Sequence, residues 1–381
     1  METLDTRMVV HIYNPSHDEA LAMNREQYCP SSAARRTAAA FWDVARHWAA
    51  PGDYILRLPD DGSLRGAAFY SVASLLSAPL PSRVPSAPFT RDSLSVPTLP
   101  SAPLPISSVT FDWSKVTIID PWGWDRHIVG VLRRLGAPDR LVPTEAQLDR
   151  IRELSSRHTA VRVLELLNRQ PSAEVNDAAP VFTSRWCTNE DEVNAAIRDF
   201  GGLAMLKQPW SCSGRGVWRS DMGSSEQRIR KTLREQNAVE VEPLYVRTAD
   251  FAMEFYADAD GSVRYEGLSL FETHDGGGYA GNVIAPQSEL RCRLEALAPP
   301  SLLDAEGRLP LDELAARLCS VLSEVLSPLP SHLFPPPSSL LPYEGPLGVD
   351  MMLTPEGIHP CIEVNLRNTM GRVAIFQARA K

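Results

Sequence analysis

The sequence lacks several features that mark common classes of protein. Only six of its 381 residues are cysteines, and none stands in a C-x-x-C pair, so we expect neither a zinc site nor a disulfide framework. No apolar run approaches the ~18 residues of a membrane span, and residues 1–14 have no signal-like apolar core. A G-x-S-x-G nucleophile motif is also absent. We therefore expect a soluble, cytoplasmic protein with reduced thiols.

An excess of positive charge is lacking too. The formal net charge is −9, which argues against non-specific nucleic-acid binding, because that binding needs a basic surface. A locally positive pocket remains compatible with this balance. Hydrophobic residues make up 44% and charged residues 22%, as in globular proteins, and the length suggests two or three domains. We expect small-molecule partners, no nucleic acid and no membrane, and we leave a homodimer open.

Proline is the residue in clear excess, with 32 copies, eight of them between Pro79 and Pro105. Proline removes a backbone donor and blocks both helices and central strands. Residues 78–108 are therefore predicted to form an extended surface insertion. A proline-recognition motif is the alternative interpretation.

Strands alternate with helices over the first 150 residues. Strands are predicted at 7–13, 52–58 and 115–120, and helices at 32–49 and 125–136. This alternation indicates a parallel α/β layer. Near the C-terminus, strands joined by tight turns indicate an antiparallel unit. The predicted domains are an N-terminal α/β domain at 1–150, a small α+β lobe at 151–238 and an antiparallel lobe at 239–381.

A lysine and a glycine-containing loop form the first candidate site. Lys207 ends an apolar strand, and the loop that follows contains Ser213, Gly214 and Gly216. Glycines let backbone amides approach an anion closely, and a nearby lysine adds positive charge. Phosphate binding is one interpretation of this pattern, and an ordinary strand end is the other.

Two glutamates in one strand form the second candidate. Glu240 and Glu242 alternate with valines, although glutamate is disfavoured in strands. Strand backbone offers the amide and carbonyl that an adenine edge needs, and the carboxylate of Asp250 can accept a ribose hydroxyl. An edge strand protected by charge is the alternative.

The third candidate is a row of polar side chains near the C-terminus. Asp350 lies on one predicted strand of a hairpin, with Glu363, Asn365 and Arg367 on the next. Two carboxylates and an amide oxygen suit Mg²⁺, and the arginine fork suits a phosphoryl group. A cross-strand charge ladder is the alternative, but Asp350 and Glu363 would repel each other without a cation.

Together these motifs resemble the ATP-grasp superfamily. An LKxP strand, an SGRG loop, a VEVEP strand, a GVD strand and an EVNLR strand follow one another between about Arg157 and Arg372. The resemblance implies a two-lobed ATP-grasp fold after a preceding α/β domain, with ATP between the lobes. It implies ATP and one or two Mg²⁺ ions as cofactors, with Mn²⁺ as an alternative ion. The implied nucleotide-binding residues are Arg157, Lys207, Ser213, Gly214, Arg215, Gly216, Glu240, Glu242, Leu244 and Asp250; the metal ligands are Asp350, Glu363 and Asn365; and the catalytic cations are Lys207 and Arg367.

One position departs from the family pattern. Members often have a lysine just before the helix that opens the small lobe, whereas this sequence has Arg157 or His158 there. Arginine can also neutralise phosphate, so we assign the role to Arg157.

The resemblance also implies a reaction. A carboxylate would attack the γ-phosphate of ATP, and an amine or other nucleophile would take the acylphosphate. We therefore predict an ADP-forming ligase that makes a carbon–nitrogen bond, with a small-molecule kinase and an inactive nucleotide-binding or scaffold protein as alternatives. The predicted substrate-side residues, for which a helix cap or an exposed loop is the competing interpretation, are Asn14, His17, His274, Tyr279 and Asn282.

Overall fold

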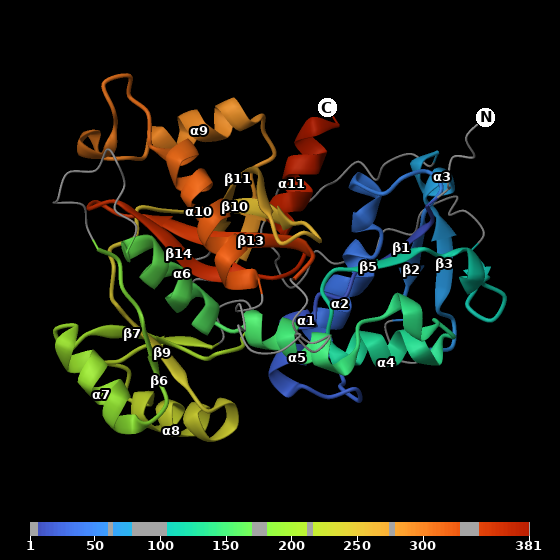
Figure 1. Cartoon of the computed structure of the whole chain (residues 1–381), viewed down its shortest axis with the longest axis horizontal. Coiled ribbons are helices and arrows are strands. Elements are labelled where there is room, and N and C mark those ends of the chain that lie inside the picture. Colours follow the sequence, from blue (N-terminus) through green and yellow to red (C-terminus); the bar gives the residue numbers. More distant parts are fainter. Residues whose placement is uncertain are drawn as a thin grey trace. The chain divides into compact units, whose positions relative to one another are not determined.

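The computed structural model describes residues 7–59, 64–77, 105–169, 181–211, 216–273, 279–327 and 343–380. They form two compact units that divide the chain between Asp149 and Arg150 (Figure 1). Most of the predicted proline-rich insertion lies outside the described residues, as do four predicted site residues: Ser213, Gly214, Arg215 and His274. Within the described ranges, no helix has the length and apolar character needed to cross a membrane.

The first unit contains a five-stranded mixed sheet in the order β4–β3–β2–β1–β5. The central strand β1 pairs in parallel with β2 and β5, whereas β3 and β4 extend the sheet in antiparallel fashion. The α/β character was predicted, but the sheet is not wholly parallel. Its strands are β1 (Val9–Ile12), β2 (Tyr54–Arg57), β3 (Ala68–Ser71), β4 (Ile106–Ser107) and β5 (Ile118–Pro121).

Short helices accompany this sheet. They are α1 (His17–Met23), α2 (Ser32–Phe41), α3 (Val72–Leu76), α4 (Arg126–Arg134), the start of α5 (Glu145–Leu154) and three 3₁₀ helices, η1 (Val44–His47), η2 (Trp113–Lys115) and η3 (Asp139–Leu141). The helix predicted at 32–49 is therefore interrupted after Phe41. Buried Arg46 donates to the carbonyl of Leu75 at 2.7 Å and pairs with Asp43, and these contacts hold the separate turn η1.

The second unit begins with a small antiparallel sheet in the order β6–β9–β7–β8. Its elements are β6 (Arg185–Cys187), α7 (Glu190–Asp199), β7 (Ala204–Lys207), β8 (Val217–Arg219), α8 (Ser225–Gln236) and β9 (Val239–Pro243). One face packs on α7 and α8 around the buried side chains of Val193, Leu206 and Val241 (Figure 1). We predicted that this lobe ends at residue 238, but β9 pairs with both β6 and β7 and so belongs to it.

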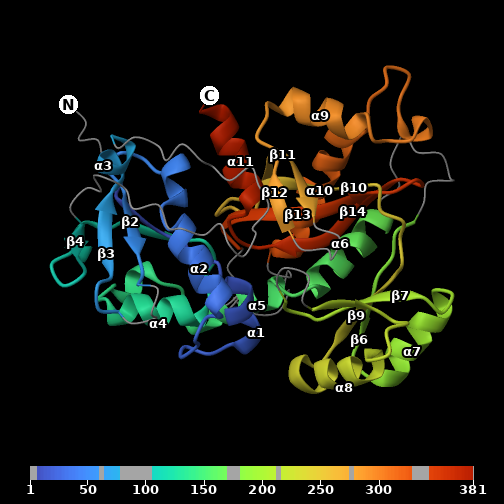
Figure 2. The same ribbon diagram turned by 180° about the vertical axis from the view of Figure 1, so that it is seen from behind.

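A larger antiparallel sheet follows, in the order β12–β11–β10–β13–β14, with β12 at one edge (Figure 2). Its strands are β10 (Ala249–Ala257), β11 (Val263–Thr273), β12 (Tyr279–Asn282), β13 (Gly345–Leu353) and β14 (Ile358–Asn365). The helices of this region are α6 (His158–Arg169), α9 (Gln287–Glu295), η4 (Pro300–Leu302), α10 (Leu311–Leu326) and α11 (Met370–Arg379). Although we expected α6 to open the small lobe, its buried side chains Val163 and Leu164 join the core of the larger sheet with Leu318.

Candidate functional site

The row of polar side chains predicted from the sequence lies on one face of the large sheet. We call it the acid row; its members are Asp350, Glu363, Asn365 and Arg367. β13 and β14 form the expected antiparallel hairpin, with Asp350 opposite Glu363. Asn365 Nδ2 donates to Asp350 Oδ2 at 3.1 Å, and Arg367 Nη2 donates to Asn365 Oδ1 at 2.9 Å. Alternation along the strand places Glu363 and Asn365 on the same face. The structure thus brings these four side chains together.

The acid row has the electrostatics of a cation site. Burial raises the pKa of Asp350 to about 7, with the Glu363 carboxylate adding to the rise and Arg367 and Asn365 opposing it. Among the described residues, no three His, Cys, Asp or Glu side chains gather as a metal cluster. The predicted set has only two carboxylates and one amide oxygen. This fits Mg²⁺, which keeps several waters and takes hard oxygen ligands.

Lys207 is the centre of a buried ion network on the small sheet. Its Nζ lies 2.8 Å from Glu242 Oε2 and 3.5 Å from Glu240 Oε1, and these three side chains are almost fully buried. Register explains the contact, because Lys207 is opposite Glu240 across β7 and β9. Burial opposes the charged form of Lys207, but the two carboxylates outweigh it and raise the lysine pKa. Burial also raises the pKa of Glu242.

Arg157 occupies the position that the sequence assigned to it. It precedes α6, and its backbone N–H donates to the Pro209 carbonyl at 3.0 Å. Its Nε donates to the Gln208 carbonyl at 3.0 Å, and its Nη2 lies 3.2 Å from Ser211 Oγ and 3.1 Å from Glu363 Oε1. Although burial opposes charging, Glu363 and the other nearby carboxylates raise the pKa of Arg157. The guanidinium therefore stays charged while it links the two sheets.

A second link joins the sheets at the same place. Lys207 Nζ donates to the carbonyl of Ile362 on β14 at 3.4 Å. Lys207 on the small sheet and Arg157 before α6 therefore both contact β14, the strand that carries Glu363, within one compact unit. The candidate site therefore combines residues from distant segments, since Arg157 and Glu363 are about 200 residues apart in sequence.

The other predicted nucleotide residues that the structure describes are Gly216, Leu244 and Asp250. Gly216 must be a glycine, because a Cβ there would lie 2.3 Å from the Ser211 Cβ. Leu244 follows β9 and is exposed. Asp250 is the second residue of β10 and pairs with Arg247 at 2.7 Å.

The predicted substrate residues occupy two separate places. Asn14 and His17 are buried in the first unit, where Asn14 Nδ2 donates to the Gly123 carbonyl at 2.8 Å and His17 Nδ1 lies 3.2 Å from Asp125 Oδ2. They tie the loop after β1 to the loop after β5. Tyr279 and Asn282 lie on β12, where Asn282 Nδ2 donates to the Leu270 carbonyl at 3.4 Å.

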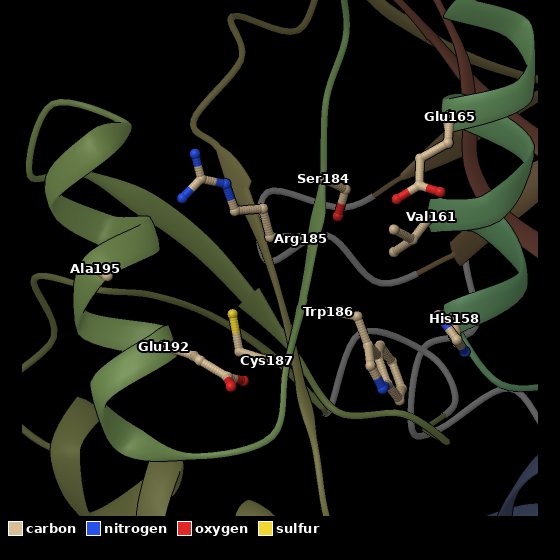
Figure 3. Close-up of a pocket in the computed structure, with 9 residues that line it drawn as sticks. All are labelled: His158, Val161, Glu165, Ser184, Arg185, Trp186, Cys187, Glu192 and Ala195. Atoms are coloured by element: carbon tan, nitrogen blue, oxygen red, sulfur yellow. The ribbon is translucent and has the colours of Figure 1, made fainter. Parts of the chain in front are cut away.

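A cavity of about 490 Å³ lies beside the ion network, between α6, β6 and α7 (Figure 3). His158 and Trp186 stack at its wall, with ring centroids 4.9 Å apart and planes 19° apart. Ser184, another lining residue, donates to Glu240 Oε1 at 2.7 Å. Ser184 thus connects the wall of the cavity to the Lys207 network. Of the predicted nucleotide residues that the structure describes, none lines the cavity.

Sequence reasoning missed Glu254, a fully buried glutamate on β10. Thr369 Oγ1 and Ser269 Oγ donate to its carboxylate at 2.7 and 3.2 Å. Burial raises the pKa of Glu254 to about 7, and Asp350 adds to the rise. The available signal was a single acid inside the apolar stretch "FAMEFYA", but a carboxylate at such a position is ambiguous without knowledge of the opposite strands.

Comparison with known proteins gives matches only among solved structures. No protein-family model matches the chain, and no curated protein does. D-alanyl-alanine synthetase A from Vibrio cholerae matches with 13% identity over 97% of this chain and 91% of that chain, at a TM-score of 0.45. A RimK domain protein ATP-grasp from Sphaerobacter thermophilus matches with 18% identity over 69% and 80%, at a TM-score of 0.37.

N5-carboxyaminoimidazole synthetase from Staphylococcus aureus, complexed with ADP, matches with 12% identity over 67% of this chain, at a TM-score of 0.41. The alignment spans 55% of that synthetase, so the chain covers only about half its length. All three matches have TM-scores below 0.5. Because their sequence identities are also low, the proposed function rests on the motifs and the geometry of the site.

Proposed function

We propose that this chain is an ATP-grasp enzyme, an ATP- and Mg²⁺-dependent ligase that releases ADP. It would activate a small carboxylic acid as an acylphosphate for attack by an amine or another nucleophile. The observation that carries the proposal is the buried network that joins Lys207, Arg157 and Glu363 across the two sheets. Buried charges are costly unless they are paired, and the family resemblance assigns Lys207 and Arg157 of this cluster to the phosphates of ATP.

The residues of the site would have two separate roles, one in binding phosphate and one in binding Mg²⁺. Lys207 and Arg157 would hold phosphate oxygens, because both are cations held in fixed positions by their neighbours. Asp350, Glu363 and Asn365 would hold Mg²⁺, which when bound neutralises phosphate charge. Pairing with Glu240, Glu242 and Glu363 keeps the two cations charged until a phosphate shares them.

Arg367 would act at the transferred group. Its guanidinium is held beside Asn365, at the edge of the proposed metal ligands. The planar guanidinium could donate two parallel hydrogen bonds to a phosphoryl group or an acylphosphate from that position. Phosphoryl transfer of this kind depends on positioning and charge neutralisation, so the proposal requires no protein nucleophile.

The test is ADP release with Mg²⁺ across a panel of amino acids, dipeptides and other small carboxylic acids. An amide product with ADP and phosphate supports the ligase, whereas a free phosphorylated product indicates the kinase. If Mg²⁺ and ATP together neither raise the melting temperature nor yield ADP, the scaffold alternative replaces both.

Glu363→Gln is the variant that tests the metal assignment. It removes one ligand charge and also the partner of Arg157. We expect ADP release to fall by about a hundredfold and the Mg²⁺ requirement to rise. Glu356→Gln, at an exposed position in the turn of the same hairpin, is the matched control and should leave both unchanged. Activity that survives Glu363→Gln at unchanged Mg²⁺ dependence would contradict the assignment.

A further inference from the structure

Glu254 lies beside the acid row, on the same face of the large sheet, and has no role in the proposed chemistry. Its two chain neighbours point into the core on the opposite face, so the Glu254 side chain points to the site face. Across the sheet, Glu254 lies opposite Gly348, and Gly348 lies opposite Asn365. The next row contains Asp350. Glu254 is therefore a neighbour of the proposed metal ligands, at 1% exposure.

Two glycines from different elements make room for this carboxylate. A Cβ at Gly348 would lie 2.8 Å from Glu254 Oε2, and a Cβ at Gly371 would lie 2.1 Å from Glu254 Oε1. Real Cβ atoms do not come this close to an oxygen. The packing of β13 and α11 thus depends on glycine at both positions, and it encloses the carboxylate.

The carboxylate is bonded to the residue that begins α11. Thr369 Oγ1 donates to Glu254 Oε2 and accepts from the backbone N–H of Arg372 at 3.0 Å. The second bond is the one that an N-cap side chain makes. One hydroxyl therefore joins Glu254 to the start of the helix, and its proton is directed to the carboxylate.

Thr369 ends the short turn that carries Arg367. This turn, residues 366–369, connects β14 to α11. The Arg367 side chain bonds to the last residue of β14, through Asn365 Oδ1 at 2.9 Å, and to the carbonyl of Asn368 within the turn at 3.2 Å. The direction of its guanidinium therefore depends on where the turn is held.

We propose that Glu254 is a positioning residue that acts through Thr369. It holds the 366–369 turn and so sets the Arg367 guanidinium beside Asn365. Its importance for catalysis rests on the proposed function, whereas its hold on the turn rests on the structure alone.

Glu266 provides a comparison in which the link to the turn is indirect. It is a half-buried glutamate on β11 that pairs with Arg372 at 2.7 Å, while its carbonyl accepts from Arg379 at 2.8 Å. Arg372 Nη1 also donates to Asn368 Oδ1 at 2.7 Å. Among the contacts of the described residues, Glu266 therefore reaches the 366–369 turn through Arg372, whereas Glu254 bonds to Thr369 of the turn directly.

The first measurement is amide hydrogen exchange in the full-length protein, over the 365–370 segment. Glu254→Met and Thr369→Val should each speed exchange there by about tenfold or more, because the buried hydrogen bond between the two side chains is lost. Thr369→Ser keeps the hydroxyl and should restore protection. Glu266→Gln should speed exchange mainly in 372–379, and in the turn by less than Glu254→Met does, because its link to the turn runs through Arg372. Unchanged exchange of the turn in both Glu254→Met and Thr369→Val would overturn the proposal.

The second measurement is steady-state ADP release with Mg²⁺ and ATP. The Glu254→Met and Thr369→Val variants should lower kcat by about tenfold to a hundredfold while KM for ATP changes little, because a small displacement of a catalytic group costs that much. The double variant should be no slower than the slower single variant, since both act through one contact. Fold-changes that multiply, or a loss in KM alone, would contradict the proposal.

The two measurements separate this inference from the proposed function. If the wild-type protein shows no ADP release and no stabilisation by Mg²⁺ and ATP, the proposed function fails. The exchange experiment then still decides whether Glu254 holds the turn.

Discussion

Replacement of Lys207 by methionine tests the ion network most directly. Methionine has a similar length but no charge, so the Glu240 and Glu242 carboxylates would lose the cation that lies 3.5 and 2.8 Å away. Both acids remain buried, at 1% and 6% exposure. Removing one partner of a buried ion pair costs about 3–5 kcal/mol, because the remaining charge is left uncompensated. We expect Lys207→Met to lower the free energy of unfolding by that amount at pH 8.

This loss should depend on pH with a definite sign. Burial already raises the pKa of Glu242, while Lys207 opposes that rise. Without the lysine, the folded-state pKa of the carboxyl rises further above its unfolded value. An acid whose pKa is higher in the folded than in the unfolded state destabilises the fold at every pH above its unfolded pKa. This destabilisation shrinks as the pH falls and the buried carboxyl binds a proton. Lys207→Met should therefore differ less from the wild type at pH 5 than at pH 8.

Chemical denaturation of the full-length protein measures the effect. Lys231→Met, at an exposed position on α8, is the control and should cost under about 0.5 kcal/mol. A triple variant, Lys207→Met with Glu240→Gln and Glu242→Gln, should recover most of the stability because no buried charge remains unpaired. The triple variant should still lack stabilisation by Mg²⁺ and ATP, which separates folding from binding. Wild-type stability in Lys207→Met, or no recovery in the triple variant, would refute the reasoning.

Two further predictions concern other buried groups. Burial lowers the pKa of His11, but Asp120 and Asp53 outweigh this effect and raise the pKa from 6.5 to about 9. His11→Gln should therefore lower the free energy of unfolding by about 3 kcal/mol below pH 6.5, and this loss should disappear as the pH rises through 9. NMR titration of the His11 imidazole should show its midpoint at about pH 9. Gly371→Ala should destabilise the protein by about 1–3 kcal/mol despite alanine's higher helix propensity, because the new Cβ would meet the Glu254 carboxylate; wild-type stability in denaturation would show that α11 can shift.

The hairpin of the acid row was predictable because its information is local. Asp350 and Glu363 lie on strands joined by a short turn, and strand alternation sets which side chains share a face. The lysine before the glycine-containing loop indicated Lys207, the family resemblance added Arg157, and the structure brings both to the hairpin. Their roles with ATP stay predictions.

Strand partners were less predictable, since pairing depends on residues far apart in the chain. The sequence indicates β9 clearly, but only the folded sheet shows that it pairs with β6 and β7. For the same reason, the mixed order of the first sheet was read as parallel. An amphipathic pattern likewise shows that α6 has an apolar face, but not which sheet covers it.

By itself, the sequence determined most of the strands and helices and supplied the residues that we propose bind ATP and Mg²⁺. Periodicity and turn chemistry act over a few residues, so a linear chain displays them directly. The tertiary structure decided which charges meet, and it alone showed Glu254. A carboxylate in an apolar strand becomes a buried anchor only when Gly348 and Gly371, distant in sequence, leave room for it and Thr369 donates to it. Such a role depends on three-dimensional neighbours, which local patterns do not contain.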